Sequence, residues 1–297
     1  MADQAERVDG ALRRLVGAHP RQWRDFDYVY PVLSRRSGGL SIGVNLNVDK
    51  VCNWDCVYCQ VDRTTPPSRR DVDLDQLRAE LGWTLGWAAD GRIWADEQFA
   101  DVPEALRRIN DIAFSGDGEP TTYEHFDDAC AIAAELKAAH QLDQVKLIVL
   151  TNMTMLHRRQ VVRGLSILDE HNGEIWAKLE AGSEAYYQQI DRSAVKFLRV
   201  LDNIRQAGRV RPIVIQSLFM HLHGQPTPNA EFDAYLDRLS ELLSDGCQIK
   251  LVQLYTTARR PAEPFVTPLT NSELDALAAR LRRRLPDLPC QTYYGLT

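Results

Sequence analysis

The segment from Cys52 to Cys59 reads CNWDCVYC and places three of the six cysteines in a C-x3-C-x2-C spacing. Clustered cysteines in a chain without a secretory signal indicate metal ligation rather than disulfides. A structural zinc site needs a fourth nearby ligand, but the next histidine and cysteine are His125 and Cys130. A 4Fe–4S cubane held by three thiolates leaves one iron open to another ligand. The spacing therefore favours such a cluster, with Cys52, Cys56 and Cys59 as its ligands.

A second polar segment, Ser115 to Pro120, reads SGDGEP and follows a short apolar stretch. Its two glycines permit close backbone approach to a ligand, and Glu119 offers a negative charge to an ammonium group. A glycine-rich turn between a strand and a helix is also a common purely structural feature. Taken alone, the segment leaves both interpretations open.

The rest of the chain alternates short apolar β-branched stretches with longer amphipathic ones, which is typical of parallel strands joined by crossover helices. The pattern predicts strands over Gly39–Val48, Asp111–Ser115, Val145–Leu150, Glu174–Glu180, Pro212–Phe219 and Gln248–Tyr255. It predicts helices over Asp73–Asp90, Tyr123–Ala139, Met155–Leu168, Val195–Ala207, Ala230–Ser244 and Asn271–Leu285. Such an order gives a doubly wound sheet or a barrel, and ligands bind at the carboxyl ends of the strands in both.

Polar residues do follow the later strands. Thr151 and Asn152 end the third strand, and Lys178 and Glu180 share one face of the fourth. These two charges predict either contact with a ligand or a self-satisfied ion pair. Less specific candidates stand near the ends of the fourth, fifth and sixth strands: Ser183, Gln216, His221, His223, Arg259 and Arg260.

Composition restricts the class of protein. The chain has 297 residues, 44% hydrophobic and 26% charged, which is typical of a folded globular protein. A net charge of −6 disfavours a general nucleic-acid binder, and no apolar stretch is long enough to span a bilayer. The start lacks a secretory signal, so we expect a cytoplasmic protein. We expect an N-terminal extension or lid over 1–38, a core over 39–285 and a tail over 286–297.

The cysteine segment resembles the defining motif of the radical S-adenosylmethionine (radical SAM) superfamily, C-x3-C-x-aromatic-C, with Tyr58 before Cys59. Residues 115–120 resemble the Gly-Gly-Glu-Pro motif of that superfamily, with Asp117-Gly118 in place of the glycine pair. The resemblance implies a partial (β/α)6 TIM-like barrel with one 4Fe–4S cluster. It also implies reductive cleavage of S-adenosylmethionine (SAM) to a 5′-deoxyadenosyl radical that abstracts hydrogen from a substrate.

The resemblance assigns further roles. Tyr58 is expected to lie along the adenine of SAM. The segment Gly116–Glu119, called the glycine loop below, is expected to contact the methionine group of SAM. The other SAM-binding candidates at strand ends are Thr151, Asn152, Lys178, Glu180 and Ser183, of which Lys178 and Glu180 are also the catalytic candidates. The full set at the glycine loop is Gly116, Asp117, Gly118 and Glu119. A reducing partner such as flavodoxin or ferredoxin is implied.

Within the superfamily, residues 28 to about 264 look like the wyosine-synthase-related iron–sulfur oxidoreductases. The tRNA enzymes of that group carry a second cluster bound by upstream cysteines, whereas this chain has no cysteine before Cys52. Wyosine-type tRNA modification, through the loop Arg63–Arg70 and the arginines at 280 and 282–284, is therefore an alternative to the leading hypothesis. Modification of a partner protein is another, and plain electron carriage a third. Cys130, Cys247 and Cys290 are predicted to be buried small residues.

Overall fold

The computed structural model describes residues 23–67 and 69–296 and divides into two compact units. Unit 1 comprises Met1–Val51, Pro67–Val149 and Arg158–Glu174, and unit 2 comprises Cys52–Pro66, Leu150–His157 and Ile175–Thr297. The strand order of the main sheet is β1-β2-β3-β4-β5-β6-β9-β11, and that of a small sheet is β10-β7-β8. No helix among the described residues has the length and apolar character required to cross a membrane.

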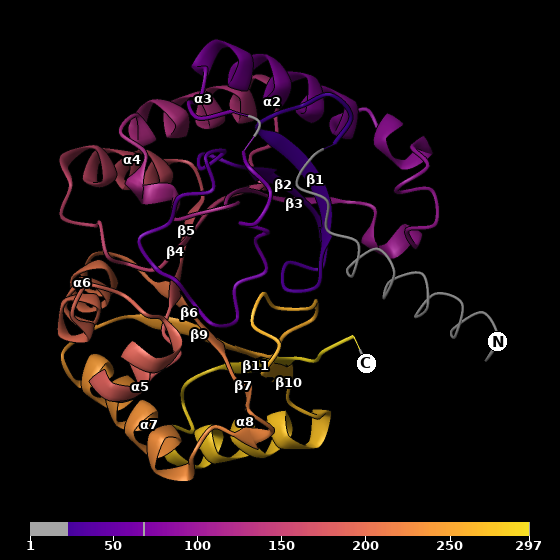
Figure 1. The fold of residues 1–297 in the computed structure, drawn as a ribbon. Helices are drawn as coiled ribbons and strands as arrows, with labels where there is room; N and C mark the ends of the chain where they lie inside the picture. Colours follow the sequence, from indigo (N-terminus) through magenta and orange to yellow (C-terminus); the bar gives the residue numbers. More distant parts are fainter. Residues whose placement is uncertain (1–22, 68, 297) are drawn as a thin grey trace. The chain divides into compact units, whose positions relative to one another are not determined.

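Unit 1 contains the first strands and three long helices. The strands are β1 (Val29–Ser34), β2 (Gly39–Val44), β3 (Ile109–Phe114) and most of β4 (Lys146–Thr151), and the helices are α2 (Leu74–Ala89), α3 (Phe126–Ala139) and α4 (Arg159–Glu170). Short 3-10 turns lie at Arg92–Ala95, Glu104–Leu106 and Pro120–Thr122. The three helices lie side by side (Figure 1). Strands β2, β3 and β4 are parallel, and Val44, Phe114 and Val149 share one register row, so the loops after β2 and β3 leave the same edge.

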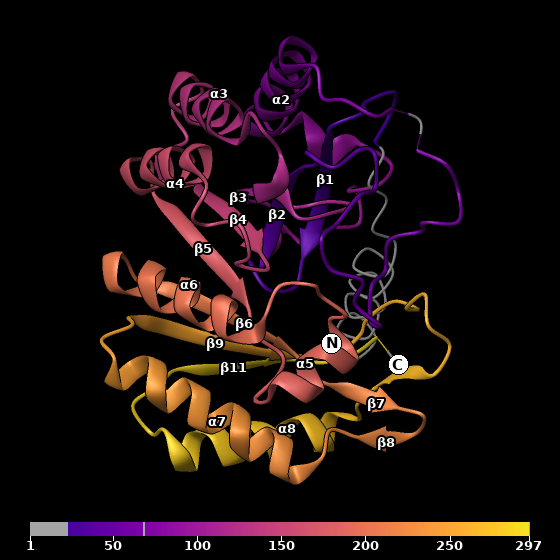
Figure 2. The same ribbon diagram turned by 60° about the vertical axis from the view of Figure 1, so that its left-hand side comes forward.

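Unit 2 contains the second half of the strands. These are most of β5 (Gly173–Lys178), then β6 (Ile213–Leu218), β9 (Ile249–Tyr255) and β11 (Cys290–Tyr293), all parallel. The helices are α5 (Glu184–Ile190), α6 (Phe197–Val210), α7 (Asn229–Ser244) and α8 (Asn271–Arg284), and the small sheet consists of β7 (Met220–Leu222), β8 (Gln225–Pro226) and β10 (Val266–Pro268). Figure 2 shows α7 and α8 side by side. Lys178, Gln216 and Gln253 share a register row near the carboxyl ends of their strands.

Local sequence explains these elements. Strands β2 and β6 are buried at every residue, as expected for parallel strands covered on both faces. Helix α2 begins after Asp73, whose side chain accepts from the backbone N–H groups of Asp75 and Gln76. Helix α8 begins with a capping box between Thr270 and Glu273. Each of the six predicted strands and six predicted helices is present with nearby bounds, which confirms the α/β class.

The sequence did not predict four features: β1, α5, β11 and the small sheet. Strand β1 contains Pro31 and pairs antiparallel with β2, at the edge position where a strand tolerates proline. The segment that leads into β1 is held by the Glu80 carboxylate of α2. This carboxylate accepts hydrogen bonds from the backbone N–H groups of Asp27, Tyr28 and Val29, at 3.0, 2.9 and 3.1 Å respectively. Residues 1–22 of the predicted N-terminal extension lie outside the described residues. The division into extension, core and tail stays a prediction.

Asp111 on β3 gives a first testable prediction. Burial raises its pKa to about 6, although its hydrogen bond with Ser41 acts in the opposite direction. The pKa of Asp111 is higher in the folded state than in the unfolded state. Its contribution to the free energy of unfolding is therefore complete below about pH 4 and is lost as the pH rises through about 6. The loss amounts to about 3 kcal/mol. The free energy of unfolding of Asp111→Asn, relative to the parent, should therefore rise between pH 4 and 7 in urea titrations. If the difference in unfolding free energy between the variant and the parent is constant across that range, the pKa of Asp111 is not raised in the folded protein.

Candidate functional site

The cysteine loop of unit 2 is fixed by its apolar residues. Trp54, Val57 and Tyr58 are 3%, 2% and 5% exposed, whereas all three cysteines are partly exposed. The end of α5 holds this loop, because the backbone N–H of Val57 donates to the carbonyl of Ile190 at 2.8 Å. The Trp54 ring packs edge-on against Tyr187, with centroids 5.5 Å apart. The loop therefore holds three partly exposed cysteines on a buried apolar support.

The donor set fits an iron–sulfur cluster. None of the six cysteines, all of which lie in the described part of the chain, forms a disulfide. Within that part, no three His, Cys, Asp or Glu side chains are arranged to hold a single metal ion. A cubane binds each thiolate at a different iron, so its cysteines need not converge on one point. The roles of Cys52, Cys56 and Cys59 as cluster ligands stay a prediction.

A buried group of charged side chains adjoins Tyr58. Its hydroxyl donates to Asp191 Oδ1 at 2.8 Å, and Lys178 Nζ lies 4.7 Å from the centroid of its ring. Lys178 Nζ also lies 2.9 Å from Glu180 Oε1. The two side chains thus form the ion pair that was one of the two interpretations of the sequence, the other being contact with a ligand. Asp191 and Glu180 are each 1% exposed. Lys178 is therefore the cation among two buried carboxylates and a phenol.

The charges in this group influence one another. Burial lowers the pKa of Lys178, but the Glu180 carboxylate together with Tyr255 and Cys56 outweighs it and keeps that pKa well above its usual value. Burial, and then the charge of Glu180, raises the pKa of Asp191. Asp191 Oδ2 and Glu180 Oε2 are buried and have no hydrogen-bond partner within the described part of the chain. The raised pKa favours the neutral form of Asp191, so Lys178 and Glu180 form the charged pair of this group. No local pattern indicated Asp191 as a site residue, because its partner Tyr58 lies far away along the chain.

The residues after β4 support the cysteine loop from another direction. Asn152 Nδ2 donates to Asn53 Oδ1 at 2.8 Å, and Asn53 Nδ2 donates to Thr154 Oγ1 at 2.6 Å. Thr151 Oγ1 accepts from the N–H of Met153 at 3.0 Å. Thr151 and Asn152 are thus both engaged within unit 2. Their contacts with SAM stay a prediction.

Ser183 has a structural role at the start of α5. Its hydroxyl donates to Glu231 Oε2 at 2.6 Å and accepts from the N–H of Tyr186 at 3.2 Å, as a helix-capping residue does. Gln216 Nε2 donates to Gln253 Oε1 at 2.8 Å in the buried row beside Lys178. The ribose contact of Ser183 stays a prediction.

The glycine loop belongs to unit 1. A Cβ on Gly116 would lie 2.2 Å from Asn45 Oδ1, and one on Gly118 would lie 2.3 Å from the carbonyl oxygen of Val51. Close packing therefore requires glycine at both positions. Asp117, which departs from the superfamily motif, accepts from Asn45 Nδ2 at 2.7 Å and so joins this loop to the end of β2.

Glu119 is 3% exposed and accepts hydrogen bonds from the backbone N–H and hydroxyl of Thr121. Asn47, in the loop after β2, donates to Thr122 Oγ1 at 3.1 Å. Asn45 and Asn47 were not predicted as site residues, although the Asn-Leu-Asn segment near the end of the first predicted strand, Gly39–Val48, was a signal for them. SAM binding by Gly116, Asp117, Gly118 and Glu119 stays a prediction.

The remaining candidates have other contacts. His221 Nε2 lies 2.9 Å from Glu273 Oε1, and His223 stacks on Phe265 with centroids 4.4 Å apart. Cys130 and Cys247 are buried as predicted, but Cys290 is partly exposed, so that prediction was wrong. Cys290 lies on β11, a strand of four residues of which none is fully buried.

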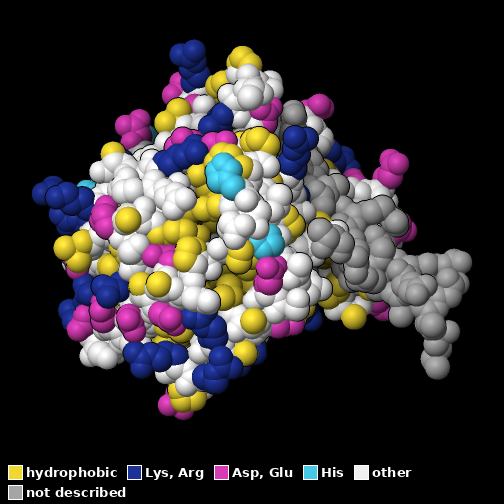
Figure 3. All heavy atoms as spheres, turned by 60° about the horizontal axis from the view of Figure 1, so that its bottom comes forward, with side chains coloured by type: hydrophobic (Ala, Val, Ile, Leu, Met, Phe, Trp, Pro, Cys, Tyr) yellow, Lys and Arg dark blue, Asp and Glu magenta, His cyan; other side chains and the backbone are white. Residues whose placement is uncertain are grey.

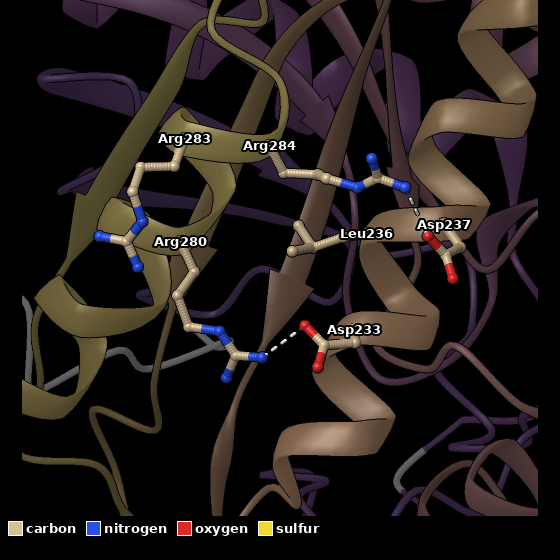
Figure 4. Close-up of a pocket in the computed structure, with 6 residues that line it drawn as sticks. All are labelled: Asp233, Leu236, Asp237, Arg280, Arg283 and Arg284. Carbon is tan, nitrogen blue, oxygen red and sulfur yellow. Dashed lines mark hydrogen bonds and ion pairs between the residues drawn. The ribbon is translucent and has the colours of Figure 1, made fainter.

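The arginines of α8 do not form a continuous basic surface. In the groove between α7 and α8, Arg280 pairs with Asp233 at 2.6 Å and Arg284 pairs with Asp237 at 3.1 Å, while Arg283 points away from both aspartates (Figure 4). Figure 3 shows acidic and basic side chains interspersed on the face that it presents. These pairs disfavour α8 as a nucleic-acid contact.

The family model of the Radical SAM superfamily matches residues 46–226, more than half of the chain, including the cysteine loop and the glycine loop. The chain belongs to the radical SAM superfamily. Enzymes of this superfamily use a 4Fe–4S cluster and SAM, so both are the cofactors of this chain. The expected superfamily, enzyme class and cofactors are thereby confirmed.

Two curated relatives of this radical SAM chain are similar to most of it. The GTPase Obg of Brachyspira hyodysenteriae is 23% identical over 253 residues, which are 82% of this chain and 32% of Obg. A UPF0026 protein of Methanocaldococcus jannaschii is 25% identical over 253 residues, which are 80% of this chain and 65% of that protein. The chain thus spans less than two thirds of either relative.

Two solved radical SAM structures share the fold. SuiB of Streptococcus suis bound to S-adenosylmethionine has a TM-score of 0.59 at 13% identity, covering 87% of this chain and 52% of SuiB. A spore photoproduct lyase variant with a dinucleoside spore photoproduct has a TM-score of 0.52 at 14% identity, covering 82% of this chain and 74% of the lyase. This likeness confirms the partial TIM-like barrel fold.

Proposed function

We propose that this chain is a radical SAM enzyme that generates a 5′-deoxyadenosyl radical and uses it to abstract hydrogen from a substrate. The observation that carries the proposal is the cysteine loop, whose three partly exposed cysteines lie on a buried support within the residues that match the superfamily. When bound, the reduced cluster supplies one electron that cleaves a C–S bond of SAM to give methionine and the radical.

Individual residues of the chain have further proposed roles in binding the cluster and SAM. Cys52, Cys56 and Cys59 are the proposed cluster ligands, and Tyr58, oriented by Asp191, is the proposed contact for the adenine of SAM. Lys178 is the proposed partner of the SAM carboxylate, with Glu180 as its counter-ion or a ribose contact. The loop Gly116–Glu119 is the proposed contact for the SAM ammonium. We further propose a cytoplasmic location and a flavodoxin or ferredoxin as electron donor.

Reductive cleavage of SAM tests this proposal directly. The protein is reconstituted anaerobically with iron and sulfide and then incubated with dithionite and SAM. We expect release of 5′-deoxyadenosine that depends on dithionite, measured by liquid chromatography and mass spectrometry. A preparation with a complete cluster that releases none would overturn the proposal. Omission of dithionite from an otherwise identical sample provides the control.

A further inference from the structure

A second feature of unit 2 is a pocket that directly follows β9. Its walls are formed by residues 257–261, 263, 264 and 266–268 and by Leu296, and its volume is ≈ 340 Å³. This size lies at the lower end of the range for small-molecule sites, which is about 300–1,000 Å³. Its position at the carboxyl end of a parallel strand is where ligands of barrel and doubly wound folds bind.

The charged residues that line the pocket leave an excess of positive charge. They are Arg259, Arg260 and Glu263. The Glu263 carboxylate lies 2.6 Å from Arg192, which is not part of the pocket wall, so its charge is compensated from outside. Arg260 is exposed and therefore accessible to a ligand. A guanidinium group donates two parallel hydrogen bonds to a carboxylate or a phosphate, and two adjacent arginines strengthen that preference.

A buried hydroxyl in the pocket also lacks a partner. Thr257 lines the pocket, is 3% exposed, and its Oγ1 has no hydrogen-bond partner among residues 23–67 and 69–296. The neighbouring Thr256 differs, because its Oγ1 accepts from the N–H of Leu269 at 2.8 Å. Buried hydroxyl groups are normally hydrogen-bonded, and a threonine hydroxyl can donate to an anionic oxygen. The unsatisfied Thr257 is therefore a second, independent indication of a ligand.

The pocket wall is connected to the cysteine loop. The N–H of Ala262 donates to the carbonyl of Cys59 at 2.9 Å, and Gln60 Nε2 donates to the carbonyl of Arg259 at 2.9 Å. We propose that this pocket is the subsite for a carboxylate or phosphate group of the substrate, bound by Arg260 and Thr257. This inference rests on the proposed function and adds to it the chemical class of the substrate, a small organic anion.

Calorimetric titration of the reconstituted holoprotein with inorganic phosphate, and separately with acetate, tests the subsite. We expect the parent protein to bind at least one of these anions, and the difference between the two identifies the preferred group. Arg260→Gln should weaken that binding about 10-fold or more, since a hydrogen bond to a charged group contributes this much. Thr257→Val, which keeps the side-chain shape, should weaken it about 3-fold to 10-fold.

Arg283→Gln is the matched control, because it removes the same charge from α8, outside the pocket, and should bind like the parent. Absence of binding by the parent, or equal binding by Arg260→Gln and the parent, would overturn the subsite. Release of 5′-deoxyadenosine is measured in the same preparations. Anion binding without SAM cleavage contradicts the proposed function alone, and SAM cleavage without anion binding contradicts the subsite alone.

Discussion

Cys56→Ser is expected to lose the cluster and to lower SAM cleavage at least about 100-fold, since loss of a mere outer-shell partner of a metal ligand costs about 10–100-fold. Cys56 is the central cysteine of a loop that supplies three thiols and has no nearby cysteine to replace it. A serine hydroxyl is a poor substitute for a thiolate, which is the ligand that iron–sulfur clusters use. Iron and sulfide content, visible absorption and 5′-deoxyadenosine release are the measurements.

Cys290→Ser is the matched control for this change. Cys290 is likewise partly exposed and in unit 2, but it lies on β11 and not on the cysteine loop. We expect the control to keep the iron content and SAM cleavage of the parent. A Cys56→Ser protein with full iron content would exclude Cys56 as a ligand, whereas loss of iron in both variants would indicate a general effect of cysteine replacement.

Lys178→Met is expected to destabilise the protein by about 3–5 kcal/mol, the usual cost of removing one partner of a buried ion pair. The change removes the cation beside the Glu180 side chain, which is 0% exposed. The double variant Lys178→Met/Glu180→Gln removes both charges, and replacing both partners of a buried pair is often close to neutral. We therefore expect the double variant to recover most of the lost stability in anaerobic urea unfolding. If the single and double variants are equally unstable, the pair does not behave as a buried ion pair.

The double variant also separates the two interpretations of Lys178. If Lys178 only neutralises Glu180, the stable double variant should keep the parent KM for SAM. If the pair binds SAM, through Lys178 on its carboxylate or Glu180 on its ribose as proposed, the KM should rise about 10-fold or more because a charge-assisted hydrogen bond is lost. The KM is measured from initial rates of 5′-deoxyadenosine release. An unchanged KM would remove Lys178 from the SAM site and leave it as a structural residue.

The sequence predicted the elements whose signals are local. Strands such as β6 are continuous apolar stretches, and α8 begins with a recognisable capping box, so both could be located from short windows. Strand β11 has only four residues, none of them fully buried, and therefore has no clear apolar pattern. Its pairing with β9 depends on contacts between distant segments.

The same distinction holds for the candidate site. The spacing of Cys52, Cys56 and Cys59 is a local motif, and it was found directly. Asp191 was not found, because a single acidic residue after a short helix has no pattern of its own and gains meaning only through the Tyr58 hydroxyl. Thr257 is similar: nothing in its neighbourhood in the sequence shows that its hydroxyl is unpaired while that of Thr256 is satisfied.

The buried support of the cysteine loop has a consequence for maturation of the protein. Trp54, Val57 and Tyr58 are packed, and Asp55 and Val57 are hydrogen-bonded to the end of α5, through contacts that involve only protein atoms. We therefore expect these contacts to contribute to folding of the segment whether or not metal is bound, in contrast to small domains that remain unfolded until they bind metal. Cluster assembly is then expected to act on a loop whose backbone is already held by protein contacts.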